Sequence, residues 1–235
     1  MVPLRDDNPI RITPYVTYGL IAANIIVFLY EISLPPPVLD AFFRSWAVVP
    51  RELSLTLEGA IIPTSPVPEW ITLISSQFLH GGFLHIAGNM LFLWIFGNNV
   101  EDRLGHIKYL IFYITCGILA ALSQWIFAQG STIPSLGASG AIAGVMGAYI
   151  LRYPQAPIVT FIPLGLFSNI VRVPAYFFLG FWFVQQAFNG LASLNTPVDM
   201  GMQGGVAYWA HAGGFIFGAI LGPIFGLFSN PTEEY

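Results

Sequence analysis

Six long stretches of the chain are almost entirely apolar, and the polar and charged residues gather between them. The stretches cover residues 15–30, 82–97, 109–128, 139–151, 174–191 and 207–228. A helix that crosses a bilayer needs about 20 apolar residues, so this pattern predicts a bundle of membrane-spanning helices. The fourth stretch is too short to cross alone. One of its ends is therefore expected to stop within the bilayer, beside backbone that protein covers or that lines a wet cavity.

The composition supports this interpretation. Of 235 residues, 55% are hydrophobic and only 9% are charged, whereas a soluble domain carries roughly 25% charged residues. The net charge of −4 comes with no basic run, which argues against a nucleic-acid partner. The single cysteine, Cys116, excludes an internal disulfide. We expect an all-α polytopic membrane protein of six spans, surrounded by lipid, without the internal repeat of many transporters.

The basic residues predict the orientation. Six of the eight lie at the N-terminus or in the loops after the second and fourth stretches: Arg5, Arg11, Arg103, Lys108, Arg152 and Arg172. Arg44 and Arg51 follow the first stretch. By the positive-inside rule the N-terminus is cytoplasmic, and spans two, four and six begin at the outer face. We expect the plasma (inner) membrane, with a site that opens outward.

Three regions are expected along the chain: a short cytoplasmic N-terminus (1–14), a six-helix membrane domain (15–229) and a tail (230–235). Within the domain, the long first outer loop (34–70) mixes aromatic and charged residues, which is typical of a segment lying in the membrane interface. A small soluble cap is the alternative. The loop 189–206, with glycine and asparagine, is a candidate flexible lid.

A few polar residues interrupt the apolar stretches. His85 and Asn89 are four apart and share a helix face, Ser139 opens the fourth stretch, and His211 lies near the start of the sixth. Such residues are costly in a membrane and are functional candidates by default. Since all three spans begin at the outer face, the four side chains are expected at a similar depth.

Small residues continue the faces of Ser139 and His211 at helical spacing. Those after Ser139 are Ala143 and Gly147, and those after His211 are Gly214, Gly218 and Gly222. Stripes of small residues let helix backbones approach closely, so packing along them would bring Ser139 toward His211. Gly137 and Gly140, which flank the serine, are expected to serve the same close approach.

These residue types suit acyl transfer. A serine hydroxyl needs a nearby base, and a neutral His211 can take its proton and return it to a leaving amine. The Ser139 backbone N–H and the side chains of His85 and Asn89 are candidate oxyanion donors. No carboxylate lies in the outer halves of these spans, so a dyad is expected. Each residue also has a structural reading: Ser139 as a helix cap, His211 and Asn89 as interhelical hydrogen-bond partners.

The motifs around these residues resemble those of rhomboid intramembrane serine proteases over about residues 78–218. They are His80-Gly-Gly-Phe-Leu-His85-Ile-Ala-Gly-Asn89, Glu101 with Gly105, Gly137-Ala-Ser139-Gly140, and Ala210-His211-Ala-Gly-Gly214 with Gly218. The resemblance implies a six-helix core, Ser139 as nucleophile, His211 as general base, His85 and Asn89 in the oxyanion hole, and a cap over a water-filled site. It also implies membrane-anchored protein substrates that reach the site near the fifth helix.

The chain departs from the family pattern in its first outer loop. The adjacent Trp-Arg pair often found there is replaced by Arg44-Ser45-Trp46 and a separate Arg51. With neither a seventh span nor a large soluble domain, the chain resembles a minimal member of the family.

Three functions remain open, and an intramembrane serine endopeptidase is the leading one. A catalytically silent rhomboid-like protein that binds membrane clients is disfavoured by the presence of Ser139 and His211. A channel or transporter with a metal on His80, His85 and His211 is disfavoured because no carboxylate or cysteine is expected at their depth. His80 is expected to be a structural residue at the interface. No metal or other cofactor is expected.

Overall fold

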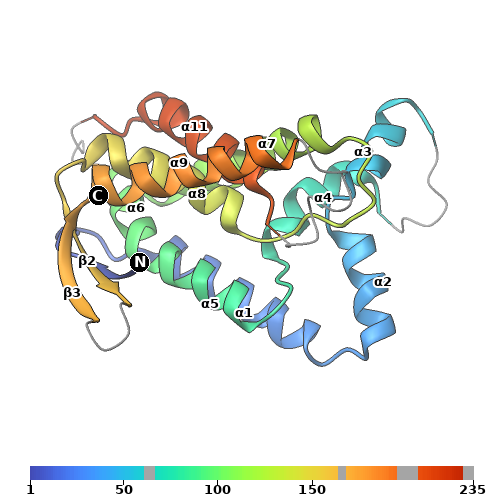
Figure 1. Cartoon of the computed structure of the whole chain (residues 1–235), viewed down its shortest axis with the longest axis horizontal. Coiled ribbons are helices and arrows are strands. Elements are labelled where there is room, and N and C mark those ends of the chain that lie inside the picture. The colour runs from blue at the N-terminus through green and yellow to red at the C-terminus, as the bar shows by residue number, and fades with distance from the viewer. Residues whose placement is uncertain (61–66, 164–167, 195–205, 230–235) are drawn as a thin grey trace.

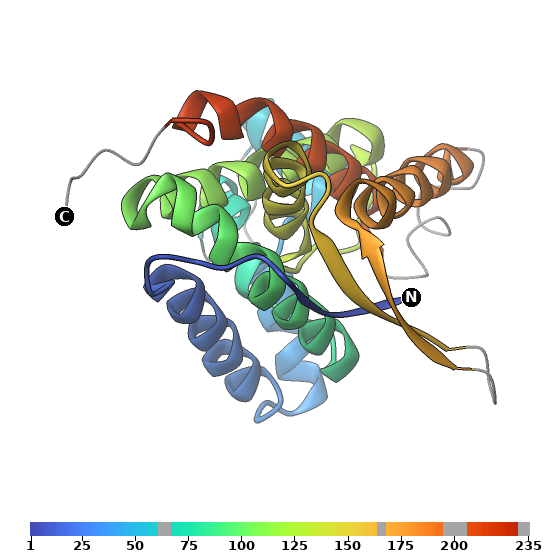
Figure 2. The ribbon, with the colours of Figure 1, turned by 90° about the vertical axis from the view of Figure 1, so that its left-hand side faces the viewer.

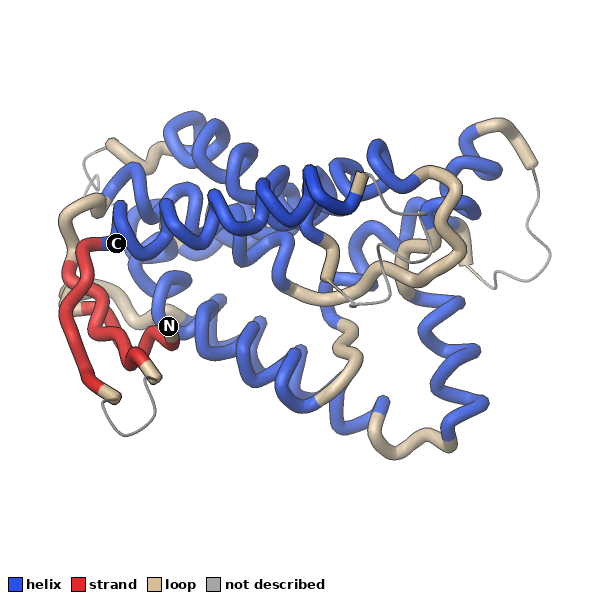
Figure 3. Tube along the Cα trace, in the orientation of Figure 1, coloured by secondary structure: helices blue, strands red, loops and turns tan. Residues whose placement is uncertain are grey.

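The computed structural model describes residues 1–60, 67–163, 168–194 and 206–229. The described part is mostly helical, with a small three-stranded sheet at one end of the long axis and short helices at the other (Figures 1 and 3). The C-terminal tail that was expected at residues 230–235 lies outside the described residues.

Each of the six apolar stretches forms a helix. These are α1 (Tyr15–Glu31), α5 (Phe83–Phe92), α7 (His106–Ala128), α8 (Ser139–Arg152), α9 (Ala175–Ser193) and α11 (Tyr208–Phe225). The second helix continues beyond its apolar stretch, through a π-helical turn (Leu93–Gly97) into α6 (Asn98–Leu104). The helical prediction is confirmed to within a few residues at most ends.

The number of spans stays a prediction. Within the described residues, α7 and α11 are long and apolar enough to cross a membrane. A pair of segments bent by 82°, Glu69–Phe78 and Phe83–Leu104, would make a third span, and α1 is apolar but shorter.

Helix α8 forms the centre of the bundle. Its 14 residues rise only about 21 Å, less than the roughly 30 Å hydrocarbon core, and every residue from Gly140 to Tyr149 is buried. Helices α7 and α11 pack against it most extensively, and α5, α6 and α9 also touch it. The end view in Figure 2 shows α8 enclosed by its neighbours. A helix shielded on all sides by protein does not need the full length of a lipid-facing span.

The α8–α11 contact is made by backbone. A Cβ added at Gly218 would meet the Gly144 backbone, and one at Gly214 would meet the Gly140 carbonyl oxygen, both closer than real Cβ atoms are found. A Cβ at Gly147 would likewise meet the Phe215 carbonyl oxygen. The two helices therefore pack at a distance that only glycine permits at these positions.

The sheet corrects the all-α expectation. Strand β1 (Val2–Asp6) pairs antiparallel with β2 (Pro157–Ile162), which pairs antiparallel with β3 (Asn169–Pro174). Part of the segment expected to be a simple cytoplasmic N-terminus is thus a strand. Its partner lies about 150 residues away, and such a pairing rests on tertiary contacts that a short local pattern does not carry.

The first outer loop is partly helical. It contains α2 (Pro36–Trp46), α3 (Pro50–Leu57) and α4 (Glu69–Ser75), the last followed by a 3₁₀ turn (Ser76–Phe78), while residues 61–66 lie outside the described part. No residue of α2 is buried, and that helix extends from the bundle at the end opposite the sheet (Figure 1). Its predicted position in the membrane interface stays a prediction.

Candidate active site

Ser139 and His211 are in direct contact. The serine is the first residue of α8, the histidine lies in the first turn of α11, and 2.7 Å separates Ser139 Oγ from His211 Nε2. The glycine-lined crossing of the two helices brings together residues that are 72 apart in the chain. This separation is that of a hydroxyl hydrogen-bonded to an imidazole nitrogen, the arrangement in which the base can take the serine proton.

The other ring nitrogen of His211 has a partner that is not among the predicted site residues. Gln186 Oε1, from α9, lies 2.8 Å from His211 Nδ1. No carboxylate lies in the outer halves of spans two, four and six, so no residue was expected to orient the histidine. A neutral amide within an apolar stretch was the signal that could have identified Gln186.

His85 and Asn89 face the turn that precedes the serine. A Cβ built on Gly137 would lie 2.8 Å from His85 Nε2 and 3.7 Å from Asn89 Nδ2, so only a glycine leaves this space open. Gly137 also has a φ of +125°, a conformation that side chains disfavour. Its N–H donates to the Ser76 carbonyl, which ties the turn to the end of the outer loop.

His80 is buried among protein side chains, as suits a structural residue, and its expected depth at the membrane interface stays a prediction. It is 1% exposed, and its Nε2 lies 2.9 Å from Asn89 Nδ2. Its ring meets that of His85 edge-on at 5.1 Å. Its backbone N–H donates to the carboxylate of Glu31, at the end of α1. The expectation that no carboxylate lies at the depth of these histidines is therefore wrong. Within the described residues no group of three or more histidines, cysteines and carboxylates is placed to hold a metal ion.

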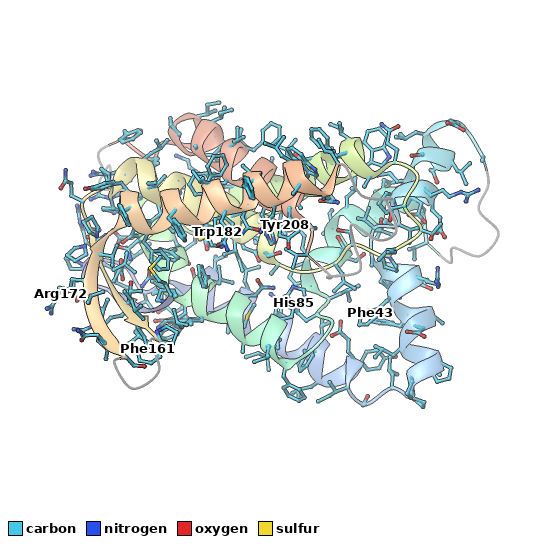
Figure 4. The ribbon with its side chains drawn as sticks, in the orientation of Figure 1. Phe43, His85, Phe161, Arg172, Trp182 and Tyr208 are labelled. Atoms are coloured by element: carbon cyan, nitrogen blue, oxygen red, sulfur yellow. The ribbon has the colours of Figure 1, made fainter. Side chains whose placement is uncertain are left out.

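A cavity of about 1060 Å³ connects these side chains with the outer loop. Ser139, His211, His85 and Asn89 all line it. Its further walls include Asp40, Phe43 and Arg44 of α2, the segment 133–136 and Trp182 of α9. Figure 4 labels Phe43, His85 and Trp182, which reach this region from three different helices. The volume and the largely apolar walls suit a segment of polypeptide rather than a small ion.

The family follows from comparison with known proteins. The family model described as the Rhomboid domain matches residues 67–228, more than half of the chain. The chain belongs to the rhomboid family. Rhomboid proteins are integral membrane proteins, and proteases are among them.

Two bacterial rhomboid proteases and a yeast mitochondrial protein are among the similar proteins. Rhomboid protease AarA of Providencia stuartii is 32% identical over 87% of the chain and 70% of AarA. Rhomboid protease GluP of Bacillus subtilis is 35% identical over 58% of the chain and 24% of GluP. Rhomboid protein 1, mitochondrial, of Saccharomyces cerevisiae is 28% identical over 90% of the chain. The chain spans 56% of the yeast protein's length.

The remaining rhomboid motif, Glu101 with Gly105, lies away from the cavity. The fully buried Glu101 carboxylate accepts hydrogen bonds from the backbone N–H groups of Val16 and Thr17 and from the Thr17 hydroxyl. His106 also contacts it, at 2.6 Å. Gly105, with a φ of +74°, makes the break between α6 and α7. Through these hydrogen bonds the motif holds the first turn of α1 against the end of α6.

Proposed function

We propose that this rhomboid protein is an intramembrane serine endopeptidase that uses a Ser139–His211 dyad. The observation that carries the proposal is the 2.7 Å contact between Ser139 Oγ and His211 Nε2 on the wall of the cavity. The protease relatives AarA and GluP support the same activity.

In the proposed mechanism His211 accepts the hydroxyl proton while Ser139 Oγ attacks the carbonyl carbon of the scissile peptide bond. The oxyanion of the tetrahedral intermediate is stabilised by the backbone N–H of Ser139 and by the side chains of His85 and Asn89. The N-terminal end of α8 adds the positive end of its dipole. The protonated His211 then gives its proton to the leaving amine, and water hydrolyses the acyl-enzyme with His211 again as base.

The proposed substrates are transmembrane segments of membrane proteins. A substrate helix must open locally before its backbone can reach a serine, since a helix keeps its carbonyls hydrogen-bonded internally. We further propose that residues 15–229 form the membrane domain, with the N-terminus in the cytoplasm and the cavity open to the outer face of a plasma (inner) membrane. Mitochondrial relatives make an organelle membrane the alternative. The loop 189–206 as a lid stays a proposal, and most of it lies outside the described residues.

Purified protein in liposomes with a tethered transmembrane substrate tests this function. Ser139→Ala and His211→Ala should each lower turnover by at least about 10³-fold, while Ser33→Ala, at an exposed serine after α1, should leave it unchanged. A fluorophosphonate should label Ser139 alone. Undiminished cleavage by Ser139→Ala would refute the mechanism. Substrate binding without cleavage by the wild type would favour the catalytically silent client-binding protein.

A further inference from the structure

The two ring nitrogens of His211 have different partners. Nε2 faces Ser139 Oγ at 2.7 Å and Nδ1 faces Gln186 Oε1 at 2.8 Å. A neutral imidazole carries one proton, and a general base must keep the nitrogen that faces its nucleophile free to accept. An oxygen at Nδ1 holds the proton on that nitrogen, because a carbonyl oxygen can only accept. The partner of Nδ1 therefore decides whether Nε2 can act as a base.

Gln186 is well placed to keep its side-chain oxygen at His211 Nδ1. It is 8% exposed and lies on the face of α9 that packs against α11. Trp182, one turn earlier on α9, places its ring 5.7 Å from that of His211 at an angle of 34°. The same helix thus restrains the imidazole both at its edge and across its face.

We propose that Gln186 is the positioning residue of this active site, and that it holds His211 as the Nδ1–H tautomer with Nε2 directed at Ser139. This inference rests on the proposed protease function and adds a third residue to the dyad. Gln186 occupies the place that a carboxylate takes in soluble serine hydrolases. A buried carboxylate inside a membrane carries a large desolvation penalty, whereas an amide supplies the acceptor oxygen without a charge.

Three variants separate the role in positioning from a role in folding. Gln186→Leu removes the acceptor oxygen and puts a somewhat shorter, apolar side chain in its place. Gln186→Glu keeps an acceptor. Gln185→Leu makes the same change at the adjacent, exposed glutamine and is the matched control. The kcat and KM of each are measured on the tethered substrate. The tautomer of His211 is read by ¹⁵N NMR of histidine-labelled protein, with its signal assigned by its loss in His211→Ala.

We expect Gln186→Leu to lower kcat by roughly 10- to 100-fold with KM within about twofold of wild type. Gln186→Glu should recover at least part of that loss, and Gln185→Leu should match wild type. The NMR spectrum of the wild type should show the Nδ1–H tautomer, and that of Gln186→Leu a mixture. A wild-type Nε2–H tautomer would overturn the inference even if Gln186→Leu failed to fold.

The outcomes also distinguish this inference from the proposed function. If Ser139→Ala abolishes cleavage but Gln186→Leu keeps its kcat within twofold of wild type, the positioning role alone is refuted. If Ser139→Ala cleaves as well as wild type, the protease mechanism fails, and the role of Gln186 in it fails with it.

Discussion

Gly144→Ala tests whether the close packing around α8 sets the position of Ser139, the proposed nucleophile. A Cβ on Gly144 would lie 2.5 Å from Cys116 Cβ and 2.7 Å from Cys116 Sγ, on α7, and 3.3 Å from the Gly214 carbonyl oxygen, on α11. Ordinary contact begins at 3.4 Å, so the added methyl is about 0.9 Å too close to α7. It has no room to move toward α11, because that side is also filled.

The expected effect is loss of both stability and turnover. Overpacking of this kind lowers the unfolding free energy by about 1–3 kcal/mol. A misplacement near 1 Å can lower a rate by about 10²-fold. Because α7, α8 or both must shift to relieve the 0.9 Å overlap, cleavage should fall by about 10-fold or more. Unfolding is followed in mixed micelles and cleavage in liposomes. Gly19→Ala is the control, because nothing lies within 4 Å of a Cβ there. It should be neutral or stabilising by up to about 1 kcal/mol.

A second substitution tests which atoms cause the loss. Cys116→Gly removes the two atoms that the new methyl would approach most closely, Cβ and Sγ of Cys116. The double variant should therefore recover part of the loss, with a coupling energy of about 0.5–3 kcal/mol between the two sites. Equal effects of Gly144→Ala and Gly19→Ala, or strictly additive effects of Gly144→Ala and Cys116→Gly, would show that α8 is not held as tightly as its contacts indicate.

Two further predictions concern buried polar groups. Asp6 accepts hydrogen bonds from Tyr149 and Asn99 at the sheet end, and burial raises the pKa of its carboxyl. The native state therefore binds the proton of the Asp6 carboxyl more tightly than the unfolded chain does. The unfolding free energy should fall as the pH rises from about 4 through the raised pKa. Denaturation at stepped pH should show a weaker slope for Asp6→Asn, and identical slopes would contradict the assignment. Separately, Asn89→Ala should lower turnover by about 10- to 100-fold, since two oxyanion donors remain. His80→Phe should lower turnover less than Asn89→Ala does, because His80 contacts the Asn89 amide and would act only by orienting it. The double variant should then be no slower than Asn89→Ala, and additive losses in kcat would contradict this role of His80.

The helices were predictable because a lipid environment allows few backbone conformations. A backbone in lipid must satisfy its own hydrogen bonds, so a long apolar stretch such as 109–128 can hardly be anything but a helix. That α8 would be shorter than a full span was predictable from the length of the apolar stretch 139–151 alone. Sequence spacing further put Ser139, His211, His85 and Asn89 at one depth, because positions within a span fix the height of a side chain.

The parts that could not be predicted depend on contacts across the chain. The pairing of β1 with β2 involves segments too short to show a period, and a bulge between Pro3 and Arg5 shifts their register. The burial of His80 could not be predicted, because its partners, Asn89 and the Glu31 carboxylate, come from other elements. Depth along a span says nothing about which face a neighbouring helix presents.

Helix α9 has two chemically different sides. Its outward side chains Phe177, Phe181, Val184 and Phe188 are all more than half exposed, and in a bilayer these face acyl chains. Its inward side carries Gln186. If Gln186 has the role proposed for it, a lipid composition that shifts α9 away from α11 should lower turnover without any contact with the active site, because His211 then loses the oxygen that orients it.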